Sequence, residues 1–318
     1  MTATWTDLFD DRPIVLDGGL STQLTAQGAD ISGSLWTGRA LLEQPGAVRA
    51  AHAAFVRAGA DVVITASYQL SRSGFEAAGL TGDDADRALT ASTRVAREAV
   101  ASVPGSRTLV AASVGPYGAT LHDGSEYRGR YGLSRAALAD FHRERLDVLV
   151  ASAPDLLAVE TIPDVDEAAA LAVVLAEHPD LPAWVSFSAT DGARTCAGQP
   201  IEEAAAAVAD VGSVVAVGVN CTDPRYVEEL VGRMRSASGL PVVAYPNAGG
   251  TWDAVTERWA GETAEPEGAL AAAVVQSWRA AGASAVGGCC GTDARTVAAL
   301  RRLSRRAGQT HESALGEG

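Results

Sequence analysis

The sequence predicts an α/β protein, a (β/α)8 barrel in a single domain. Short apolar, β-branched runs alternate eight times with alanine-rich amphipathic segments along the 318 residues. No internal repeat or flexible linker divides the chain. Cysteines and acids follow several of the apolar runs directly, which is where barrels of this type carry their sites. The alternative architecture for this pattern is a doubly wound open sheet.

Each expected strand is a short apolar run that ends where glycine, proline or a polar residue lets the backbone turn into a loop. Runs of this kind are typical of buried parallel strands. The eight expected strands are 13–17, 61–67, 108–114, 156–161, 183–188, 214–220, 241–246 and 283–288.

The segments between these strands have helical periodicity, and several open on capping residues. Ser134 precedes one helix and Thr292-Asp293 precedes another. The expected helices are 46–59, 83–102, 134–153, 164–177, 200–210, 224–236, 267–281 and 293–306. The barrel is therefore expected over residues 1–304.

Three stretches fall outside this alternation. Residues 305–318 are polar and contain glycine, so we expect a disordered C-terminal tail. The connections 115–133 and 247–267 follow the third and seventh strands and are long for this fold. Such loops are usually lids or binding loops, and a mobile surface loop is the alternative.

Composition excludes several classes of function. The 39 acidic residues exceed the 25 basic ones, for a net charge of −14, which argues against nucleic acid and anionic membranes as partners. No apolar run reaches the roughly 18 residues of a membrane span. The first residues lack the basic region of a signal peptide. With four cysteines and no export signal, a reducing cytoplasm is the expected compartment.

The chain contains no lysine, so all 25 basic residues are arginine. This excludes Schiff-base aldolases, pyridoxal phosphate anchoring and the phosphate-binding lysine of the Walker motif. It also weakens a phosphate-binding barrel, which the glycines after the eighth expected strand would otherwise suggest.

Three cysteines follow two of the expected strands. Cys221 ends Val-Gly-Val-Asn-Cys, and Cys289 and Cys290 lie in Gly-Gly-Cys-Cys-Gly-Thr. Three thiolates at one barrel mouth, with a fourth position left open, are typical of a catalytic zinc site. A strained vicinal disulfide is the competing interpretation, and it leaves Cys221 unexplained. The remaining Cys196 is interpreted as a small core residue.

Two acids also end apolar runs, Asp17 in Leu-Asp-Gly-Gly and Glu160 in Ala-Val-Glu-Thr. A charge there is costly unless it meets a partner, so two acids at one mouth favour recognition of an ammonium group. Either alone could be a helix cap or an exposed loop acid. His52, His142 and His178 fall in helical patterns and are expected at the surface or the core edge, which leaves no convincing histidine base.

These elements resemble, in order and spacing, the homocysteine S-methyltransferase family over about residues 10–303. The paired cysteines with the upstream Asn-Cys are the most specific part of the resemblance. Ser-Val-Gly-Pro-Tyr-Gly and Gly-Ser-Glu-Tyr-Arg-Gly are most similar to the branch that uses S-methylmethionine. The motifs are Asp17-Gly18-Gly19, Thr65-Ala66-Ser67-Tyr68-Gln69, Ser113–Gly118, Glu160-Thr161, Gly218–Cys221, Tyr245-Pro246-Asn247 and Gly287–Thr292.

The resemblance implies a zinc-dependent methyl transfer to homocysteine that yields methionine. By this analogy Cys221, Cys289 and Cys290 bind Zn²⁺ and carry the catalysis. Asp17, with the adjacent Gly18, and Glu160 would hold the homocysteine ammonium group. The turn of Ser67 and Tyr68 would lie near its carboxylate.

The methyl donor is expected to be a sulfonium, S-methylmethionine or also S-adenosylmethionine. Trp36, Tyr68, Tyr117 and Tyr127 lie on or near expected mouth-side loops and could supply cation–π faces; ordinary packing is the alternative. Asn220 and Asn247 would orient substrate or neighbouring groups, or simply cap their loops. Betaine or a corrinoid as donor, and a non-catalytic zinc- or thiol-binding barrel, are the competing functions. The oligomeric state is left open.

Overall fold

The computed structural model describes residues 13–29, 35–249, 251–253, 258–260 and 272–315. Eight strands form one sheet, in the order β1-β10-β7-β6-β5-β4-β3-β2 with parallel neighbours. A parallel bridge between Leu16 and Val62 joins β1 to β2 and closes the ring. The strands are β1 (Ile14–Val15), β2 (Val62–Ile64), β3 (Leu109–Val114), β4 (Leu156–Ile162), β5 (Ala183–Phe187), β6 (Val214–Asn220), β7 (Val242–Tyr245) and β10 (Ala283–Val286). The (β/α)8 prediction is confirmed, and the open-sheet alternative is wrong.

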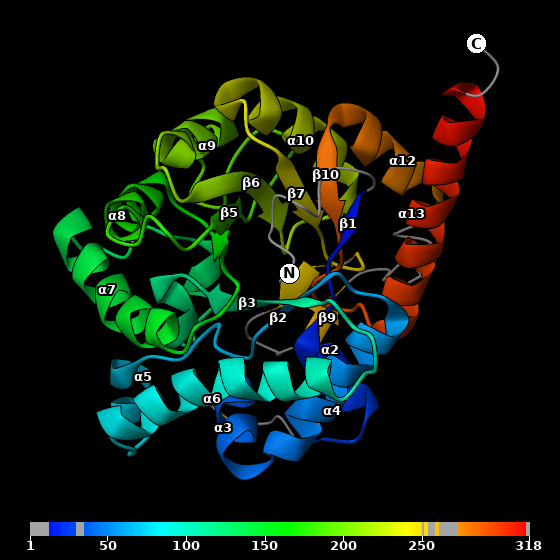
Figure 1. Cartoon of the computed structure of the whole chain (residues 1–318). Coiled ribbons are helices and arrows are strands. Elements are labelled where there is room, and N and C mark those ends of the chain that lie inside the picture. Colours follow the sequence, from blue (N-terminus) through cyan, green and yellow to red (C-terminus); the bar gives the residue numbers. More distant parts are fainter. Residues whose placement is uncertain (1–12, 30–34, 250, 254–257, 261–271, 316–318) are drawn as a thin grey trace.

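Helices surround this ring, as Figure 1 shows. They are α4 (Pro45–Ala58), α6 (Gly82–Ala101), α7 (Arg135–Ala151), α8 (Val165–Leu175), α9 (Ile201–Ala209), α10 (Pro224–Ser238), α12 (Ala272–Ala281) and α13 (Ala294–Leu315). The expected caps are present, because Ser134 Oγ accepts from Ala137 N at 3.2 Å and Asp293 Oδ1 accepts from Arg295 N at 2.9 Å. Among the described residues, no helix has the length and apolarity that crossing a membrane requires.

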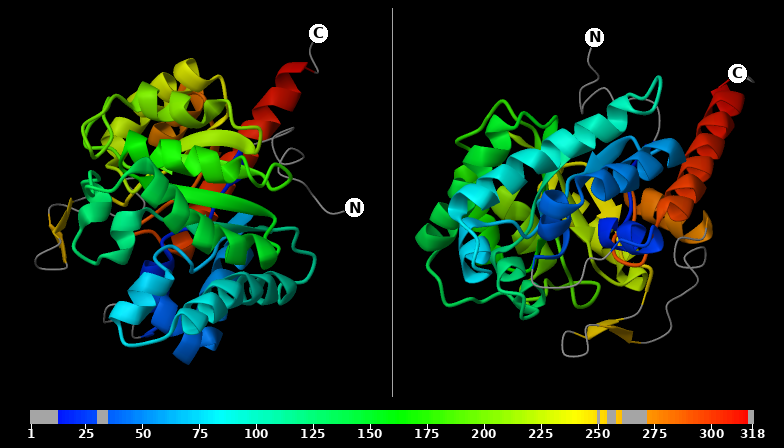
Figure 2. Two further views of the ribbon diagram at one scale, coloured as in Figure 1. Left: turned by 90° about the vertical axis from the view of Figure 1, so that its left-hand side faces the viewer. Right: turned by 90° about the horizontal axis from the view of Figure 1, so that it is seen from below.

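Several short elements were not expected from the sequence. Most of them lie in loops at the carboxyl ends of strands, where three to eight residues are too few to establish a period. They are α2 (Leu20–Ala26), α3 (Trp36–Glu43), α5 (Arg72–Ala77), the 3-10 turns η1 (Tyr117–Thr120) and η2 (Ser125–Tyr127), and the antiparallel pair β8 (Thr251–Asp253) and β9 (Arg258–Ala260). Figure 2 shows the β8–β9 hairpin standing away from the barrel. The rest of the expected 247–267 loop beyond Gly249 lies largely outside the described residues.

The last helix differs from the expected disordered tail. Helix α13 continues to Leu315 instead of ending near residue 306, and it extends beyond the barrel in Figures 1 and 2. The segment after Ser304 contains no proline and is rich in Arg, Ala, Gln and Glu, which are good helix formers. Residues 316–318 lie outside the described part.

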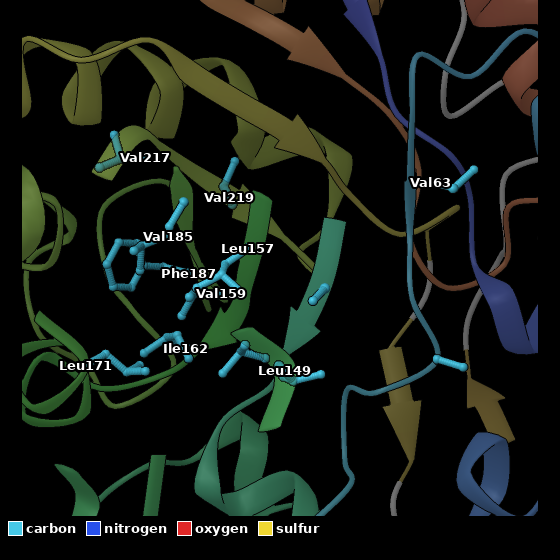
Figure 3. Close-up of a cluster of buried hydrophobic side chains, with 14 of the residues drawn as sticks. Val63, Leu149, Leu157, Val159, Ile162, Leu171, Val185, Phe187, Val217 and Val219 are labelled. Carbon is cyan, nitrogen blue, oxygen red and sulfur yellow. The ribbon is translucent and has the colours of Figure 1, made fainter. Parts of the chain in front are cut away.

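Two buried layers stabilise the barrel. The outer layer packs strand residues such as Leu157, Val159 and Phe187 against helix residues such as Leu149 and Leu171 (Figure 3). The inner layer fills the ring with Ile14, Leu16, Val62, Leu109, Ala111, Leu156, Ala158, Trp184, Ala216, Val243, Tyr245 and Ala285. Because side chains alternate along a strand, the residue that follows Leu156 and Ala158 in the inward series of β4 is Glu160. The pleat therefore directs this acid into the carboxyl end of the barrel.

Candidate metal centre and active site

The three predicted ligand cysteines converge. Their sulfur atoms all lie within 4.8 Å of one another, with Cys221 Sγ 2.7 Å from Cys289 Sγ and 3.8 Å from Cys290 Sγ. All four cysteines of the chain are free thiols, so the competing vicinal disulfide is absent. Among the described residues, this trio is the cluster of cysteine, histidine and acidic side chains with the spacing that a metal ion requires.

The backbone is shaped to bring these sulfurs together. Cys221 follows β6 with φ of +48°, a left-handed conformation that is rare for a residue with a side chain. Cys289 and Cys290 follow β10 in a turn closed by Gly291 at φ +81°. Cys289 N donates to Pro246 O at 2.8 Å. Strained backbone of this kind concentrates at functional sites.

The three thiols do not ionise alike. Hydrogen bonds from Cys289, then from Cys290, lower the pKa of the Cys221 thiol. The same contact with Cys221 raises the pKa of Cys289 and of Cys290, because a second thiolate there would meet the first one. The Cys221 thiolate thus forms readily. A bound cation would favour ionisation of the Cys289 and Cys290 thiols as well.

Glu160 is buried beside this cluster and is held by two hydroxyl donors. Ser113 Oγ donates to its Oε1, and Tyr245 Oη donates to its Oε2 at 3.1 Å. Burial, with a smaller contribution from the charge of Cys221, raises the pKa of Glu160 to about 7. Among the described residues, no cation pairs with this carboxyl group.

Asp17 is the second buried acid at the mouth. Its Oδ2 accepts from Ile64 N at 2.8 Å, which links the end of β1 to β2. Burial raises the pKa of Asp17 well above its ordinary value, and the nearby charge of Glu160 adds to the effect. The structure thus brings the two predicted acids within electrostatic range of each other, as the sequence suggested.

Asn220 positions the residue after Glu160. Its Oδ1 accepts from Thr161 N at 2.7 Å and from Ser186 Oγ at 2.9 Å, and its Nδ2 donates to Thr161 Oγ1 at 2.7 Å. These bonds hold Thr161 at φ +62°. Of the two roles considered for Asn220, the geometry favours orientation of a neighbouring group over loop capping.

The remaining predicted substrate contacts lie at the same end of the barrel. Ser67 Oγ donates to Ser113 O at 2.7 Å, so this hydroxyl joins the loop after β2 to β3. Asn247 N donates to Thr222 O at 3.1 Å, while Asn247 Oδ1 is buried without a partner among the described residues. A Cβ on Gly18 would meet Phe55 Cε1 at 3.0 Å. The side-chain oxygen of Asn247 is thus free to accept a hydrogen bond from a substrate.

The four aromatic residues expected to line the donor pocket differ in their surroundings. The Tyr127 side chain hydrogen-bonds to Cys221 and helps to lower its pKa, and burial raises the pKa of Tyr127 itself. The Tyr68 side chain hydrogen-bonds to Thr161 beside the same cluster. The Tyr117 ring packs on Tyr131 at 5.2 Å and on Phe141 at 5.0 Å between ring centroids, which favours the packing alternative. The side chain of Trp36 lies outside the described residues.

Sequence reasoning missed Arg145, a fully buried arginine on α7. Its Nη1 donates to Gly115 O at 2.9 Å and its Nη2 to Tyr68 O at 2.7 Å, so one guanidinium holds the loops after β2 and β3 together. Burial lowers the pKa of Arg145 to about 10. The signal was present, since Arg145 shares a helix face with Leu138, His142 and Leu149.

The histidines are more buried than expected. His142 is fully buried and bonds Glu167 Oε1 through Nε2 at 2.9 Å. His52 is also fully buried, and burial alone lowers its pKa to about 4. The expectation of surface or core-edge positions is wrong for both, because an inward-facing helix position can hold a neutral imidazole.

The fold and this mouth define a (β/α)8-barrel protein with a candidate three-thiol metal site. A sequence model of homocysteine S-methyltransferases matches residues 14–304. The chain belongs to the homocysteine S-methyltransferase family and is a methyltransferase enzyme. It is 43% identical to homocysteine S-methyltransferase 4 of Zea mays, over 92% of this chain and 90% of that protein.

Two further comparisons agree. The chain is 38% identical to homocysteine S-methyltransferase YbgG of Bacillus subtilis (strain 168), over 94% of this chain and 96% of that protein. The crystal structure of the metallated form of the homocysteine methyltransferase MmuM from Escherichia coli superimposes with a TM-score of 0.83. It is 37% identical, covering 94% of this chain and 99% of that one.

Proposed function

We propose that this enzyme transfers a methyl group from S-methylmethionine to the thiolate of L-homocysteine, with zinc held by Cys221, Cys289 and Cys290. The observation that carries the proposal is the convergence of these three thiols beside two buried acids in a homocysteine S-methyltransferase barrel. Free thiols in all four cysteines suit the reducing cytoplasm that the sequence predicts.

The residues present fit a zinc ion. Zinc–sulfur bonds of about 2.3 Å in a tetrahedron place neighbouring sulfurs about 3.8 Å apart. The separation of Cys221 and Cys290 is 3.8 Å, and that of Cys221 and Cys289 is shorter. Three soft thiolates with a fourth position free are the donor set of a catalytic zinc site. Zinc bound there would lower the pKa of a substrate thiol and supply it as a thiolate.

Two acids would hold the other end of homocysteine. Asp17 and Glu160 are buried, and the charge of Glu160 helps to raise the pKa of Asp17. Neither acid has a cationic partner among the described residues. An ammonium group between them would remove that cost, which supports the ammonium assignment. Asn247, with its free Oδ1, is a further candidate contact for the amino acid substrate.

The transfer itself needs no proton from the protein. The homocysteine thiolate attacks the sulfonium methyl carbon, a new S–C bond forms, and the old S–CH3 bond breaks to release a neutral thioether. The chain's contribution is to align the two sulfurs and to exclude water. Tyr127, hydrogen-bonded to Cys221 and buried, lies where it would cover the reacting sulfur.

A donor comparison tests the proposal. Initial rates with homocysteine are measured for S-methylmethionine, S-adenosylmethionine, betaine and methylcobalamin, using protein purified with and without added zinc. We expect the highest rate with S-methylmethionine and a rate that depends on about one zinc per chain. Full activity of metal-free protein contradicts the zinc assignment, and a faster rate with betaine or methylcobalamin contradicts the donor.

One substitution separates catalysis from simple binding. Cys289→Ser is expected to abolish methyl transfer and zinc retention while the far-UV circular dichroism stays that of the folded barrel. Cys196→Ser is the matched control, because Cys196 lies outside the sulfur cluster. A non-catalytic barrel would instead bind zinc and homocysteine tightly and turn over no donor.

A further inference from the structure

Glu126 is a buried acid at the barrel mouth that the reaction described above does not use. It lies in η2, in the loop after β3, and is 8% exposed. The turn is fixed in place, since Ser125 N donates to Asp123 Oδ1 at 2.9 Å. A Cβ on Gly118 would lie 2.5 Å from Glu126 N, so η1 packs directly on this turn. These contacts within the loop thus fix the backbone position of Glu126.

The turn that carries Glu126 lies against β4, the strand that also carries Glu160. The charge of Cys221 acts on Glu126, and the charge of Glu126 acts on Tyr68. Its sequence neighbour Tyr127 hydrogen-bonds to Cys221. Glu126 therefore lies within electrostatic range of the sulfur cluster, on the side covered by the 115–133 loop.

Glu126 forms no ion pair within the described part of the chain, and its own backbone N–H is the hydrogen-bond donor that stabilises its charge. Its Oε2 is buried and unbonded. The cation that acts on it, Arg128, is 64% exposed at its side chain and pairs with Asp123 at 3.2 Å. A buried carboxylate left without a cation is costly. Such groups persist where a ligand supplies the missing partner.

We propose that Glu126 binds the positive charge of the sulfonium methyl donor and selects cationic donors over neutral ones. The inference rests on the proposed function and assigns a residue to the donor half of that site. The acids Asp17 and Glu160 serve the thiol substrate, and Glu126 lies on the loop after β3, the strand next to β4. In the transfer the sulfonium sulfur takes the electron pair of the breaking S–CH3 bond and becomes neutral, so Glu126 acts mainly in donor binding.

The test measures donor and homocysteine constants separately. Glu126→Gln keeps the size of the side chain and removes its charge. Loss of a buried charge–charge contact of this kind corresponds to about a tenfold or larger change in affinity. We expect the KM for S-methylmethionine to rise by at least about tenfold, with the homocysteine KM within about twofold of wild type. Calorimetric titration with S-methylmethionine alone gives the same loss without turnover.

Asp140→Asn is the matched control, because it removes one negative charge at an exposed side chain of α7 and leaves the 115–133 loop unchanged. It is expected to change neither constant by more than about twofold. Wild-type donor binding by Glu126→Gln overturns the proposal, as does a homocysteine KM that rises as much as the donor KM. If the wild-type protein itself binds and uses no sulfonium donor, the proposed function fails first, which is a distinguishable result.

Removal of an unpaired charge also has a signature that a merely structural residue lacks. If Glu126 is held for the donor, donor-free Glu126→Gln is expected to unfold at the same or a higher temperature than wild type at pH 8. A lower unfolding temperature for Glu126→Gln in the absence of donor contradicts the proposal, because it would show that the carboxylate stabilises the loop itself.

Discussion

The carbonyl oxygen of Cys289 lies 2.5 Å from the place that a Cβ atom on Gly19 would occupy. Gly19 N donates to Thr292 O at 3.0 Å, so the turn after β1 rests directly on the cysteine turn after β10. Gly19 has φ −64°, which any residue can adopt. Glycine is therefore required here by the close approach of two backbones and not by its own conformation.

Gly19→Ala is expected to displace the Cys289 turn and weaken zinc binding by about tenfold or more, since ligand geometry controls affinity. Zinc retained after dialysis against a fixed concentration of chelator measures the effect. Gly46→Ala is the control, because no atom lies within 4 Å of a Cβ placed there. Equal zinc retention by the two variants would contradict the role assigned to Gly19.

Glu160→Gln is expected to raise the homocysteine KM by about tenfold or more and to leave the donor KM within about twofold. The amide cannot accept from both Ser113 and Tyr245 and carries no charge for an ammonium group. Because the pKa of Glu160 is raised to about 7, its carboxylate fraction grows between pH 6 and 8. The ratio of mutant to wild-type KM is expected to grow over the same interval. Glu98→Gln, at an exposed ion pair with Arg94, should behave like wild type.

Arg145→Met is expected to lower the free energy of unfolding by about 3 kcal/mol, because it leaves buried carbonyls without their donor. The kcat should fall as well, since the guanidinium holds the Tyr68 backbone. Urea unfolding measures the first effect and steady-state kinetics the second. Arg143→Met, on the exposed side of α7, is expected to lower the free energy of unfolding much less than Arg145→Met does. Equal losses of unfolding free energy in the two variants would contradict the role of Arg145 in holding the loops after β2 and β3 together.

His52→Leu is expected to make the protein less sensitive to acid. The folded pKa of His52 is about 4, below the ordinary value of 6.5, so the unfolded chain binds the proton more tightly. Wild-type stability is therefore lost as the pH falls from 6.5 towards 4, by about 2 kcal/mol at pH 5. The difference in free energy of unfolding between pH 7 and pH 5 should be smaller by about this amount in His52→Leu. An unchanged difference would contradict the assignment.

Local sequence signals predicted the main elements because they are repeated and long. The run Val214–Asn220 is six apolar or small residues followed by asparagine, and the structure has β6 with the same bounds. Ser134 is a capping residue ahead of a long helical pattern, and it likewise marked the start of α7. The short helix Arg72–Ala77 was missed, because six residues do not complete two turns and tertiary contacts decide its conformation.

The candidate site divides in the same way. Cys221 and Cys289 were predicted because both follow strand-like runs, although they are 68 residues apart in sequence. Glu126 was missed because nothing local distinguishes this buried acid from the exposed ones that surround it, and Arg145 was missed although its helix face is otherwise apolar or buried. Their roles depend on carbonyl groups and charges that other segments bring to them.

The amino-acid sequence by itself determined the eightfold alternation, the chemistry available at the strand ends and, through the absence of lysine, the mechanisms that are closed to this enzyme. Only the tertiary structure decided which sulfurs meet, that Asn220 holds Thr161, and that Glu126 lies buried and unpaired beside the sulfur cluster. The physical reason is that strand and helix patterns arise from interactions between near neighbours in sequence. A site arises from backbones and charges that come together only when the barrel closes.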